Sequence, residues 1–143
     1  MAAVLRIESR SFEFPWNDDD FVVALRRRNC IGMVAEHENR IVGHMIYDLE
    51  PNRLRLLNIA VCPDHRRIGI GSHLVRKLIS KLSLSGRDSL ALEVRETNVA
   101  AQLFFRSLGF RAVSILRDYY DQSDEDAYAF VIRANQVAET SAV

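Results

Sequence analysis

A turn in the middle of the chain contains the residue types that bind phosphate groups. It reads Arg66-Arg67-Ile68-Gly69-Ile70-Gly71 and lies between a strand-like segment, residues 53–62, and a helix-like segment, residues 72–84. Glycine lets a backbone approach a ligand closely, and the first N–H groups of a helix have no partner within the helix. We therefore expect this phosphate-binding turn, residues 66–71, to hold a phosphate or a diphosphate. The two arginines alone would also fit an exposed basic turn.

Two common nucleotide-binding motifs do not fit this turn. A Walker loop requires a Lys-Ser or Lys-Thr pair after its glycines, and no such pair follows them here. A Rossmann motif is closer, because Glu93 ends the next strand, where a ribose-binding acid would lie. However, Leu74 takes the place of the third glycine, and residues 63–69 intervene where a Rossmann strand runs almost directly into its first glycine. We therefore disfavour a dinucleotide.

Composition and charge are those of an ordinary globular domain. The chain has 143 residues, 48% hydrophobic and 27% charged, with a formal net charge of zero. We expect one domain over residues 1–133 and a polar C-terminal tail over residues 134–143. The balanced charge gives no reason to expect nucleic acid or a membrane as a partner, and no segment is long and apolar enough for a membrane span or an export signal.

The two cysteines, Cys30 and Cys62, have no His or Cys partner at metal-ligand spacing. We expect them to be buried free thiols in a reducing cytoplasm, and we expect no bound metal.

The hydrophobic periodicity predicts an α/β fold. Helical patterns cover residues 2–11, 18–28, 72–84 and the segment after Asn98, and strand patterns cover residues 31–36, 41–49, 53–62, 89–95, 110–117 and 126–133. Asn17 and Asn98 are suited to cap the helices that follow them, and Gly109 is suited to end the last helix. This order predicts a mostly antiparallel sheet with one β-α-β crossover over residues 53–95, which contains the phosphate-binding turn.

Four segments resemble successive motifs of the GNAT superfamily of N-acetyltransferases. The turn matches [Q/R]-x-x-G-x-G, and the other segments are Asn58-Ile59-Ala60-Val61, Leu92-Glu93-Val94-Arg95 with Asn98, and Phe104-Phe105-Arg106-Ser107-Leu108-Gly109-Phe110. The Glu93 segment, together with Tyr119-Tyr120 and Glu125-Asp126-Ala127, resembles the RimI type, bacterial enzymes that acetylate the N-terminal alanine of a small-subunit ribosomal protein. The catalytic subunits of eukaryotic N-terminal acetyltransferases are similar.

The resemblance covers residues 12–132 and implies the GNAT fold, a mixed and mostly antiparallel sheet flanked by helices. Family members usually begin with a strand, whereas residues 1–5 here look helical. Either the first edge strand is missing or the natural chain begins earlier.

The resemblance also implies acetyl-CoA as the cofactor. In the superfamily, the turn holds the CoA diphosphate, and the strand before it pairs its backbone with the amides of the pantetheine arm. The cofactor-binding residues implied here are Asn58, Ile59, Ala60, Val61, Arg66, Arg67, Ile68, Gly69, Ile70, Gly71, Ser72, Asn98 and Phe105. For Asn98, a role as a helix cap alone has nearly equal weight.

Acetyl transfer requires a neutral amine, and Glu93 is the candidate general base. Its neighbours Leu92 and Val94 point to the other face of the strand, so Glu93 is either functional or faces solvent. For the general acid the chain departs from its family, because RimI-type enzymes usually have tyrosine where this chain has Phe105, which has no proton to donate. Tyr119 or Tyr120 could compensate, although the two tyrosines could also simply anchor a hairpin.

We expect the acceptor to lie between the Phe14-Pro15-Trp16 loop and the Tyr119-Tyr120 loop. The second loop is rich in acids that would attract a cationic N-terminus: Asp118, Asp121, Asp124, Glu125 and Asp126. Phe14 and Trp16 could also be core residues.

The chain is therefore expected to be an acetyl-CoA-dependent N-acetyltransferase that modifies protein N-terminal amines, with a peptide or a ribosomal protein as its partner. We expect a monomer or a homodimer. The alternatives are a small-amine acetyltransferase and a CoA-binding module that has lost catalysis, which Phe105 suggests.

Overall fold

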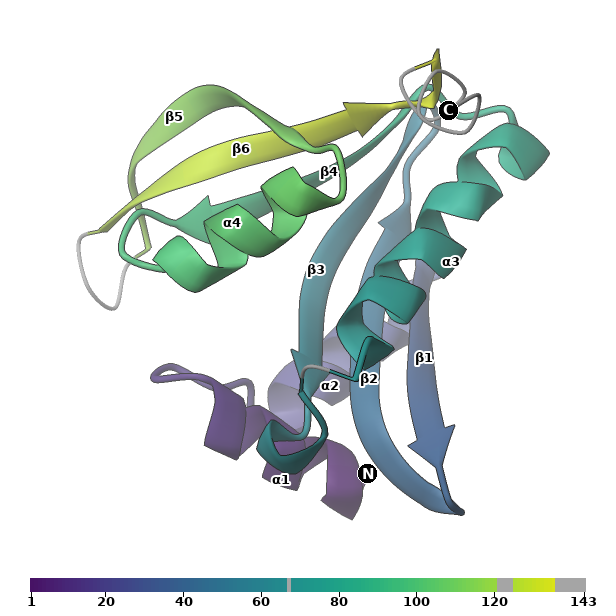
Figure 1. Ribbon diagram of the computed structural model, residues 1–143, viewed down its shortest axis with the longest axis vertical. Coiled ribbons are helices and arrows are strands. Elements are labelled where there is room, and N and C mark those ends of the chain that lie inside the picture. Colours follow the sequence, from purple (N-terminus) through teal and green to yellow (C-terminus); the bar gives the residue numbers. More distant parts are fainter. Residues whose placement is uncertain (67, 121–124, 136–143) are drawn as a thin grey trace. The chain divides into compact units, whose positions relative to one another are not determined.

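The structure, a computed structural model, describes residues 1–66, 68–120 and 125–135 (Figure 1). Its helices are α1 (Ala2–Ser11), α2 (Asp18–Arg26), α3 (Ile70–Ser85) and α4 (Val99–Ser107), with a short 3₁₀ helix, η1, at Pro63–His65. Its strands are β1 (Cys30–His37), β2 (Arg40–Leu49), β3 (Arg53–Val61), β4 (Ser89–Arg95), β5 (Arg111–Tyr120) and β6 (Glu125–Arg133). The strands form a sheet in the order β1-β2-β3-β4-β6-β5. The predicted fold, a mostly antiparallel sheet with flanking helices, is confirmed.

The elements follow the predicted order, and only their ends differ. Helix α2 ends at Arg26 rather than at residue 28, because Arg27 has extended backbone angles, with φ at −67° and ψ at 138°. Helix α3 begins at Ile70, inside the phosphate-binding turn, rather than at residue 72. The prediction of a loop at Tyr119 and Tyr120 is wrong. These residues end β5, because Tyr120 pairs with Glu125 of β6.

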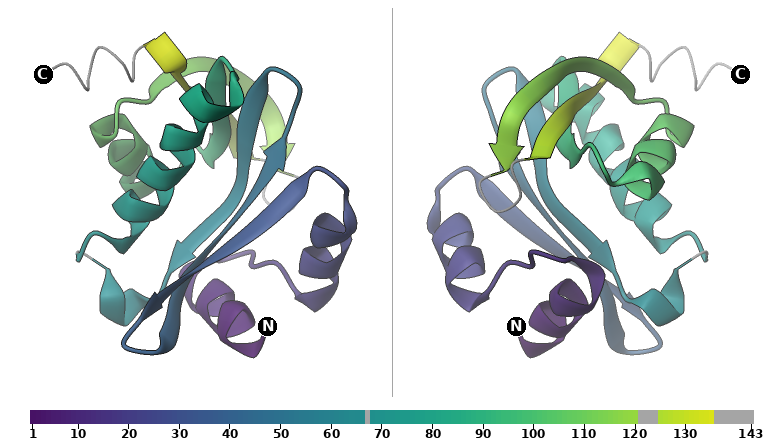
Figure 2. Two further views of the ribbon diagram at one scale, coloured as in Figure 1. Left: turned by 90° about the vertical axis from the view of Figure 1, so that its right-hand side faces the viewer. Right: turned by 90° about the vertical axis from the view of Figure 1, so that its left-hand side faces the viewer.

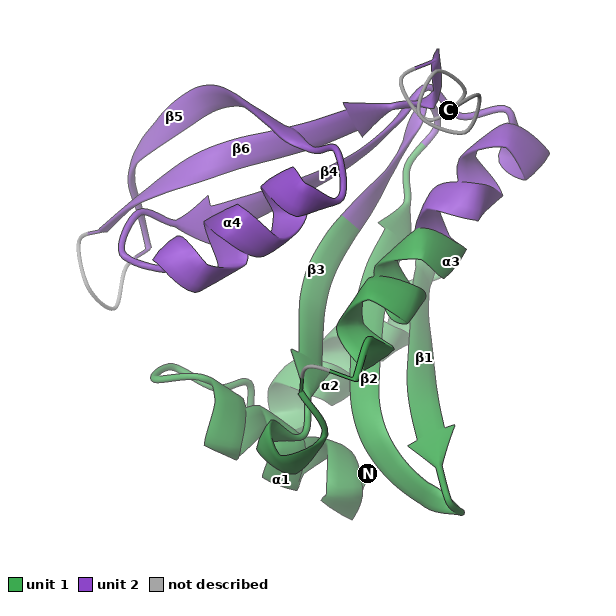
Figure 3. Cartoon of the chain, viewed as in Figure 1, with its two compact units in different colours: residues 1–50, 56–77 green, residues 51–55, 78–143 purple. Residues whose placement is uncertain are grey.

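The chain divides into two compact units (Figure 3). Unit 1 contains residues 1–50 and 56–77, and unit 2 contains residues 51–55 and 78–143. The expected boundary between a domain and a tail at residue 134 stays a prediction. Ala134 donates its N–H to the carbonyl oxygen of Asp88 (2.8 Å), and residues 136–143 lie outside the described residues. Among the described helices, none has the length and apolar character needed to cross a membrane.

In unit 1, strands β1 and β2 form a tight antiparallel hairpin between two helical layers. Its turn residues Glu38 and Asn39 have φ values of 51° and 64°, as a two-residue hairpin turn requires. Figure 2 shows α1 and α2 on one side of the hairpin and the first turns of α3 on the other. Gly43 allows a close approach on the α3 side, since a Cβ there would lie 3.1 Å from the carbonyl oxygen of Ala60 and 3.6 Å from Leu74. The hairpin thus positions the start of α3.

In unit 2, strand β4 pairs with two neighbours. It runs antiparallel to β6, which in turn pairs with β5, and it runs parallel to the start of β3, where Arg55 lies opposite Ala91. The parallel pair confirms the predicted crossover. Helix α4 lies across one face of β4 and β6 (Figure 1). Asn98 caps this helix through the N–H of Ala101 (3.1 Å), and Gly109 follows its end with a φ of 102°, as predicted.

The described residues 1–66 contain no strand before α1, so β1 is the first strand in the order of the sheet. The two alternatives, a missing first edge strand and an earlier start of the natural chain, both stay predictions. Cys30 and Cys62 are both free, as expected, but the prediction that they are buried is wrong. Cys30 starts the outermost strand and Cys62 follows the end of β3, so both keep partial exposure. Partial burial still raises the pKa of the Cys30 thiol.

Candidate active site

The predicted site residues fall into two groups, one in each unit. Unit 1 contains the phosphate-binding turn, the end of β3, and the segment with Phe14 and Trp16. Unit 2 contains the predicted catalytic residues and two predicted cofactor contacts: Glu93, Tyr119, Tyr120, Asn98 and Phe105.

The phosphate-binding turn follows η1 and runs into the first turn of α3. Gly69 has a φ of 87°, a left-handed conformation that other residues rarely adopt. Apart from Gly69 itself and its two chain neighbours, no described residue has an atom within 4 Å of the position its Cβ would take. Helix α3 begins at the next residue, and the N–H of His73 donates to the carbonyl oxygen of Gly69 (2.9 Å). The N–H groups of residues 70–72 come before this first hydrogen bond of the helix, so they have no acceptor within the helix. An anion site at the start of a helix requires such N–H groups. Arg67 lies outside the described residues.

Two hydrogen bonds fix the side chain of Arg66, the first residue of the turn. Its Nε donates to the carbonyl oxygen of Val61 (3.2 Å), and its Nη2 donates to the hydroxyl of Ser11 (3.0 Å). A guanidinium has five N–H donors, and these bonds use two of them. The guanidinium of Arg66 is therefore held between the last residue of β3 and the last residue of α1.

The end of β3 has one buried and one partly exposed face. Asn58 and Ala60 are buried, whereas Ile59 and Val61 are partly exposed. The Asn58 side chain forms hydrogen bonds with Glu8 and His44 in the interior of unit 1. The Asn58 side chain therefore already has partners within the protein. The predicted contact of the pantetheine arm is with the backbone of this strand, and it stays a prediction.

Phe14 and Trp16 lie on either side of Pro15 in the segment between α1 and α2, and both are partly buried. The Trp16 ring meets the buried ring of Phe21 edge-on, with centroids 5.1 Å apart. The backbone N–H of Trp16 donates a hydrogen bond to Oε2 of Glu8 (2.9 Å). Trp16 thus has an anchored backbone and a ring that packs at the edge of the core.

In unit 2, Glu93 is paired with an arginine. Arg55 of β3 donates from Nη2 to Oε1 of Glu93 (2.8 Å) and from Nε to Oε2 (3.4 Å). The same Nη2 donates to the hydroxyl of Tyr119 (3.0 Å). The predicted strand alternation is confirmed, because Leu92 and Val94 are buried at 3% and 4% exposure, whereas the Glu93 side chain is 19% exposed. Arg55 therefore orients the candidate base and a candidate acid together.

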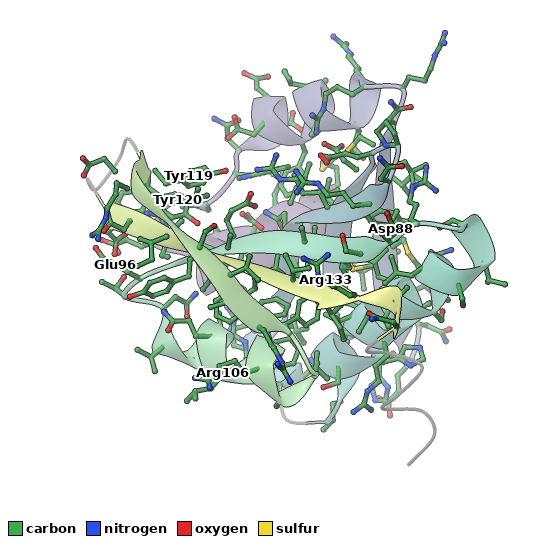
Figure 4. The ribbon with its side chains drawn as sticks, turned by 90° about the horizontal axis from the view of Figure 1, so that it is seen from above. Asp88, Glu96, Arg106, Tyr119, Tyr120 and Arg133 are labelled. Atoms are coloured by element: carbon green, nitrogen blue, oxygen red, sulfur yellow. The ribbon has the colours of Figure 1, made fainter. Side chains whose placement is uncertain are left out.

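Tyr119 and Tyr120 lie side by side at the end of β5 (Figure 4), with ring centroids 4.9 Å apart and nearly perpendicular rings. The guanidinium of Arg95 lies 3.8 Å from the centroid of the Tyr120 ring, and it also donates to Glu125 (2.8 Å). Burial raises the pKa of Tyr120 to about 12. The Tyr120 hydroxyl therefore keeps its proton at neutral pH and is a potential donor.

Phe105 lies in the core of unit 2 at 5% exposure. Its ring meets those of Phe104 and Phe110 edge-on, at centroid distances of 5.0 and 5.4 Å. Such aromatic packing suits an apolar ring. Contacts of the cofactor with Phe105 and Asn98 stay predictions.

Two of the acids predicted to attract a cationic acceptor are paired with arginines. Glu125 accepts from Arg95, and Asp126 accepts from Arg117 (2.9 Å). The backbone N–H of Asp118 also donates to Asp126, and this bond is the main cause that lowers the pKa of the Asp126 carboxyl. The negative charge at this end of β5 and β6 is thus partly balanced. Asp121 and Asp124 lie outside the described residues.

Comparison with known proteins identifies the family. The family model described as "Acetyltransferase (GNAT) family" matches residues 1–110. The chain belongs to the GNAT acetyltransferase family. It is an N-acetyltransferase with acetyl-CoA as its cofactor, and the predicted enzyme class and cofactor are confirmed.

Similar GNAT proteins cover nearly the whole chain. The [ribosomal protein bS18]-alanine N-acetyltransferase of Escherichia coli (strain K12) is 35% identical over 129 residues, which are 89% of this chain and 86% of that protein. The crystal structure of the ribosomal-protein-S18-alanine N-acetyltransferase from Escherichia coli matches with a TM-score of 0.83 and 32% identity, over 93% of this chain and 86% of that chain. The crystal structure of Ard1 from Thermoplasma volcanium matches with a TM-score of 0.83 and 27% identity, over 92% of this chain and 89% of that chain.

Sequence reasoning missed two features of this GNAT chain. Arg55 had no sequence signal, because its contact with Glu93 depends on the parallel register of β3 and β4. Glu8 did have a signal, since it lies three and four positions after Leu5 and Val4 on the apolar side of α1. A buried acid on an apolar helix face indicates partners in the interior.

Proposed function

We propose that this GNAT enzyme transfers the acetyl group of acetyl-CoA to the N-terminal α-amino group of a protein. The observation that carries this proposal is the 35% identity to the Escherichia coli alanine N-acetyltransferase over 89% of the chain. We further propose a ribosomal protein with N-terminal alanine as the acceptor. A cytoplasmic location, a monomeric or homodimeric state and the lack of nucleic-acid partners stay predictions.

In the proposed reaction, the neutral amine attacks the thioester carbonyl carbon of acetyl-CoA. The new C–N bond replaces the C–S bond, the amine loses one proton, and CoA leaves as a thiolate that takes up a proton. An α-amino group has a pKa near 8, so about a tenth is neutral at pH 7. Glu93 is the proposed acceptor of the amine proton, directly or through water. A carboxylate has about four acceptor positions, and Arg55 occupies two of those on Glu93.

Tyr119 is the proposed proton donor to the thiolate, because it shares Arg55 with Glu93. Its hydroxyl oxygen accepts a hydrogen bond from Arg55, which leaves its own O–H able to donate. A thiol pKa near 8.5 makes thiolate a tolerable leaving group, so the lack of a hydroxyl at Phe105 is compatible with catalysis. In this proposal Arg55 is a positioning residue, and Tyr120 and the Trp16 segment contact the acceptor.

A peptide panel tests the proposed acceptor. We expect a peptide with a free N-terminal alanine to be acetylated, with mass spectrometry placing the acetyl group on the α-nitrogen. The same peptide with a blocked N-terminus and an internal lysine is the matched control, and we expect no acetylation of it. Acetylation of only the lysine peptide or of polyamines would favour the small-amine alternative. Acetyl-CoA binding without acetylation of any amine would favour the CoA-binding module.

A substitution at the phosphate-binding turn tests the proposed diphosphate site. We expect Arg66→Gln to raise the KM for acetyl-CoA about ten- to a hundredfold, because a hydrogen bond between charged groups contributes about 1.5–3 kcal/mol. The increase should shrink at high salt, where ions screen the charge. Arg76→Gln, on the exposed side of α3, is the control and should leave this KM unchanged. Equal KM values for the Arg66→Gln variant and the unsubstituted protein would contradict the assignment.

A further inference from the structure

Unit 1 contains a buried carboxylate that the proposed chemistry does not use. Glu8 of α1 is 1% exposed, and within the described residues its carboxylate forms hydrogen bonds with no lysine or arginine. Carboxylates are almost never fully buried unless hydrogen bonds or an opposite charge compensate the loss of hydration. The partners of Glu8 therefore indicate what its burial achieves.

Three groups donate to this carboxylate. Trp16 donates its backbone N–H to Oε2 (2.9 Å), and Asn58 Nδ2 lies 3.1 Å from Oε1 and 3.0 Å from Oε2. His44 Nε2 lies 3.0 Å from Oε1 and 3.1 Å from Asn58 Oδ1. His44 Nδ1 is buried with no partner in the described part of the chain, so we assign the hydrogen to Nε2, which then donates. The side chains of His44 and Asn58 are themselves buried.

These contacts join segments that are far apart in the sequence. Trp16 belongs to the segment that we propose contacts the acceptor. Asn58 is the first of the four residues at the end of β3 that we propose contact the cofactor. The Asn58 backbone lies within β3, whereas Trp16 lies outside any helix or strand. The position of the Asn58 backbone is set by the strand, whereas the position of the Trp16 backbone depends on its hydrogen bond with Glu8.

We propose that Glu8 is a positioning residue that sets the affinity for the acceptor by fixing the Trp16 backbone relative to β2 and β3. The inference rests on the proposed function, in which the Trp16 segment contacts the acceptor. A carboxylate is needed because all surrounding groups are donors. A glutamine would offer one oxygen and would turn its own N–H groups toward donors. With Glu8→Gln, the Trp16 segment loosens while β3 and its cofactor contacts remain.

Two readouts test this role. Trp16 is the sole tryptophan of the chain, so its fluorescence reports on this segment without any substrate. We expect Glu8→Gln to shift the Trp16 emission to longer wavelength and to increase its quenching by acrylamide. We also expect the KM for the Ala peptide to rise about tenfold, with kcat and the KM for acetyl-CoA within about twofold of those of the unsubstituted protein.

Ile7→Ala is the matched control for general destabilisation, because Ile7 is the buried neighbour of Glu8 in α1 at 5% exposure. It should lower stability while leaving the emission and the peptide KM unchanged. An equal rise in peptide KM with Ile7→Ala would overturn the proposal, as would a shifted emission with an unchanged peptide KM. If Glu8→Gln does not fold, Glu8→Asp keeps the charge but shortens the reach to Trp16, and the same outcomes apply. If no amine is acetylated, the proposed function fails, whereas an emission unchanged by Glu8→Gln would reject the positioning role by itself.

Discussion

Glu93→Gln is expected to lower kcat for the Ala peptide about 10²- to 10⁴-fold at pH 7, the usual contribution of a general base. The substitution keeps the size of the side chain and one acceptor for Arg55, so the pairing seen at 2.8 Å can persist in part. The variant loses the group that accepts the amine proton. Steady-state kinetics with saturating acetyl-CoA measure the effect.

The pH dependence separates two parts of the role of Glu93. Because about a tenth of an α-amine is already neutral at pH 7, removing the proton before attack can account for about tenfold of the rate. This contribution should disappear by about pH 9, where the amine is mostly neutral. The ratio of kcat between the unsubstituted enzyme and the Glu93→Gln variant should therefore be about tenfold smaller at pH 9 than at pH 7. The difference in kcat that remains at pH 9 then measures how much Glu93 contributes by accepting the amine proton during the attack on the thioester.

Glu36→Gln, the same chemical change at an exposed position of β1, is the control and should leave kcat unchanged. An undiminished kcat in the Glu93→Gln variant would remove the base assignment without affecting the family or the cofactor.

Phe21→Ala is expected to reduce the free energy of unfolding by about 3–5 kcal/mol, the usual effect of removing a buried aromatic ring. Phe21 is completely buried, and its ring packs edge-on against those of Trp16 and His44, at centroid distances of 5.1 and 5.6 Å. The substitution leaves a cavity next to the Glu8 network as well as losing apolar contact. Urea unfolding followed by circular dichroism measures the change.

Val23→Ala lies in the same helix at 66% exposure and serves as the control. It should change the free energy of unfolding by no more than about 0.5 kcal/mol, the usual range for surface positions. A Phe21→Ala variant as stable as Val23→Ala would show that the site collapses around the smaller residue, and it would contradict the packing described for unit 1.

Much of the fold could be predicted because its signals are local. The caps at Asn17 and Asn98 bond within three residues of themselves, and Gly109 ends α4 in the left-handed conformation expected of it. Such signals act within one turn of chain, so sequence alone displays them. The lengths of α2 and β5 were harder, because the end of β5 depends on pairing between Tyr120 and Glu125 across the hairpin.

The sequence by itself determined the family, the cofactor and the order of the elements. The phosphate-binding turn is one continuous segment whose glycines and helix start belong together locally, so its chemistry can be recognised without a fold. The tertiary structure decided how the candidate side chains are paired. Arg55 meets Glu93 and Tyr119, and Glu8 meets Trp16, His44 and Asn58, through strand register and helix packing. These partners are between 8 and 64 positions apart, and no local preference specifies contacts over such separations.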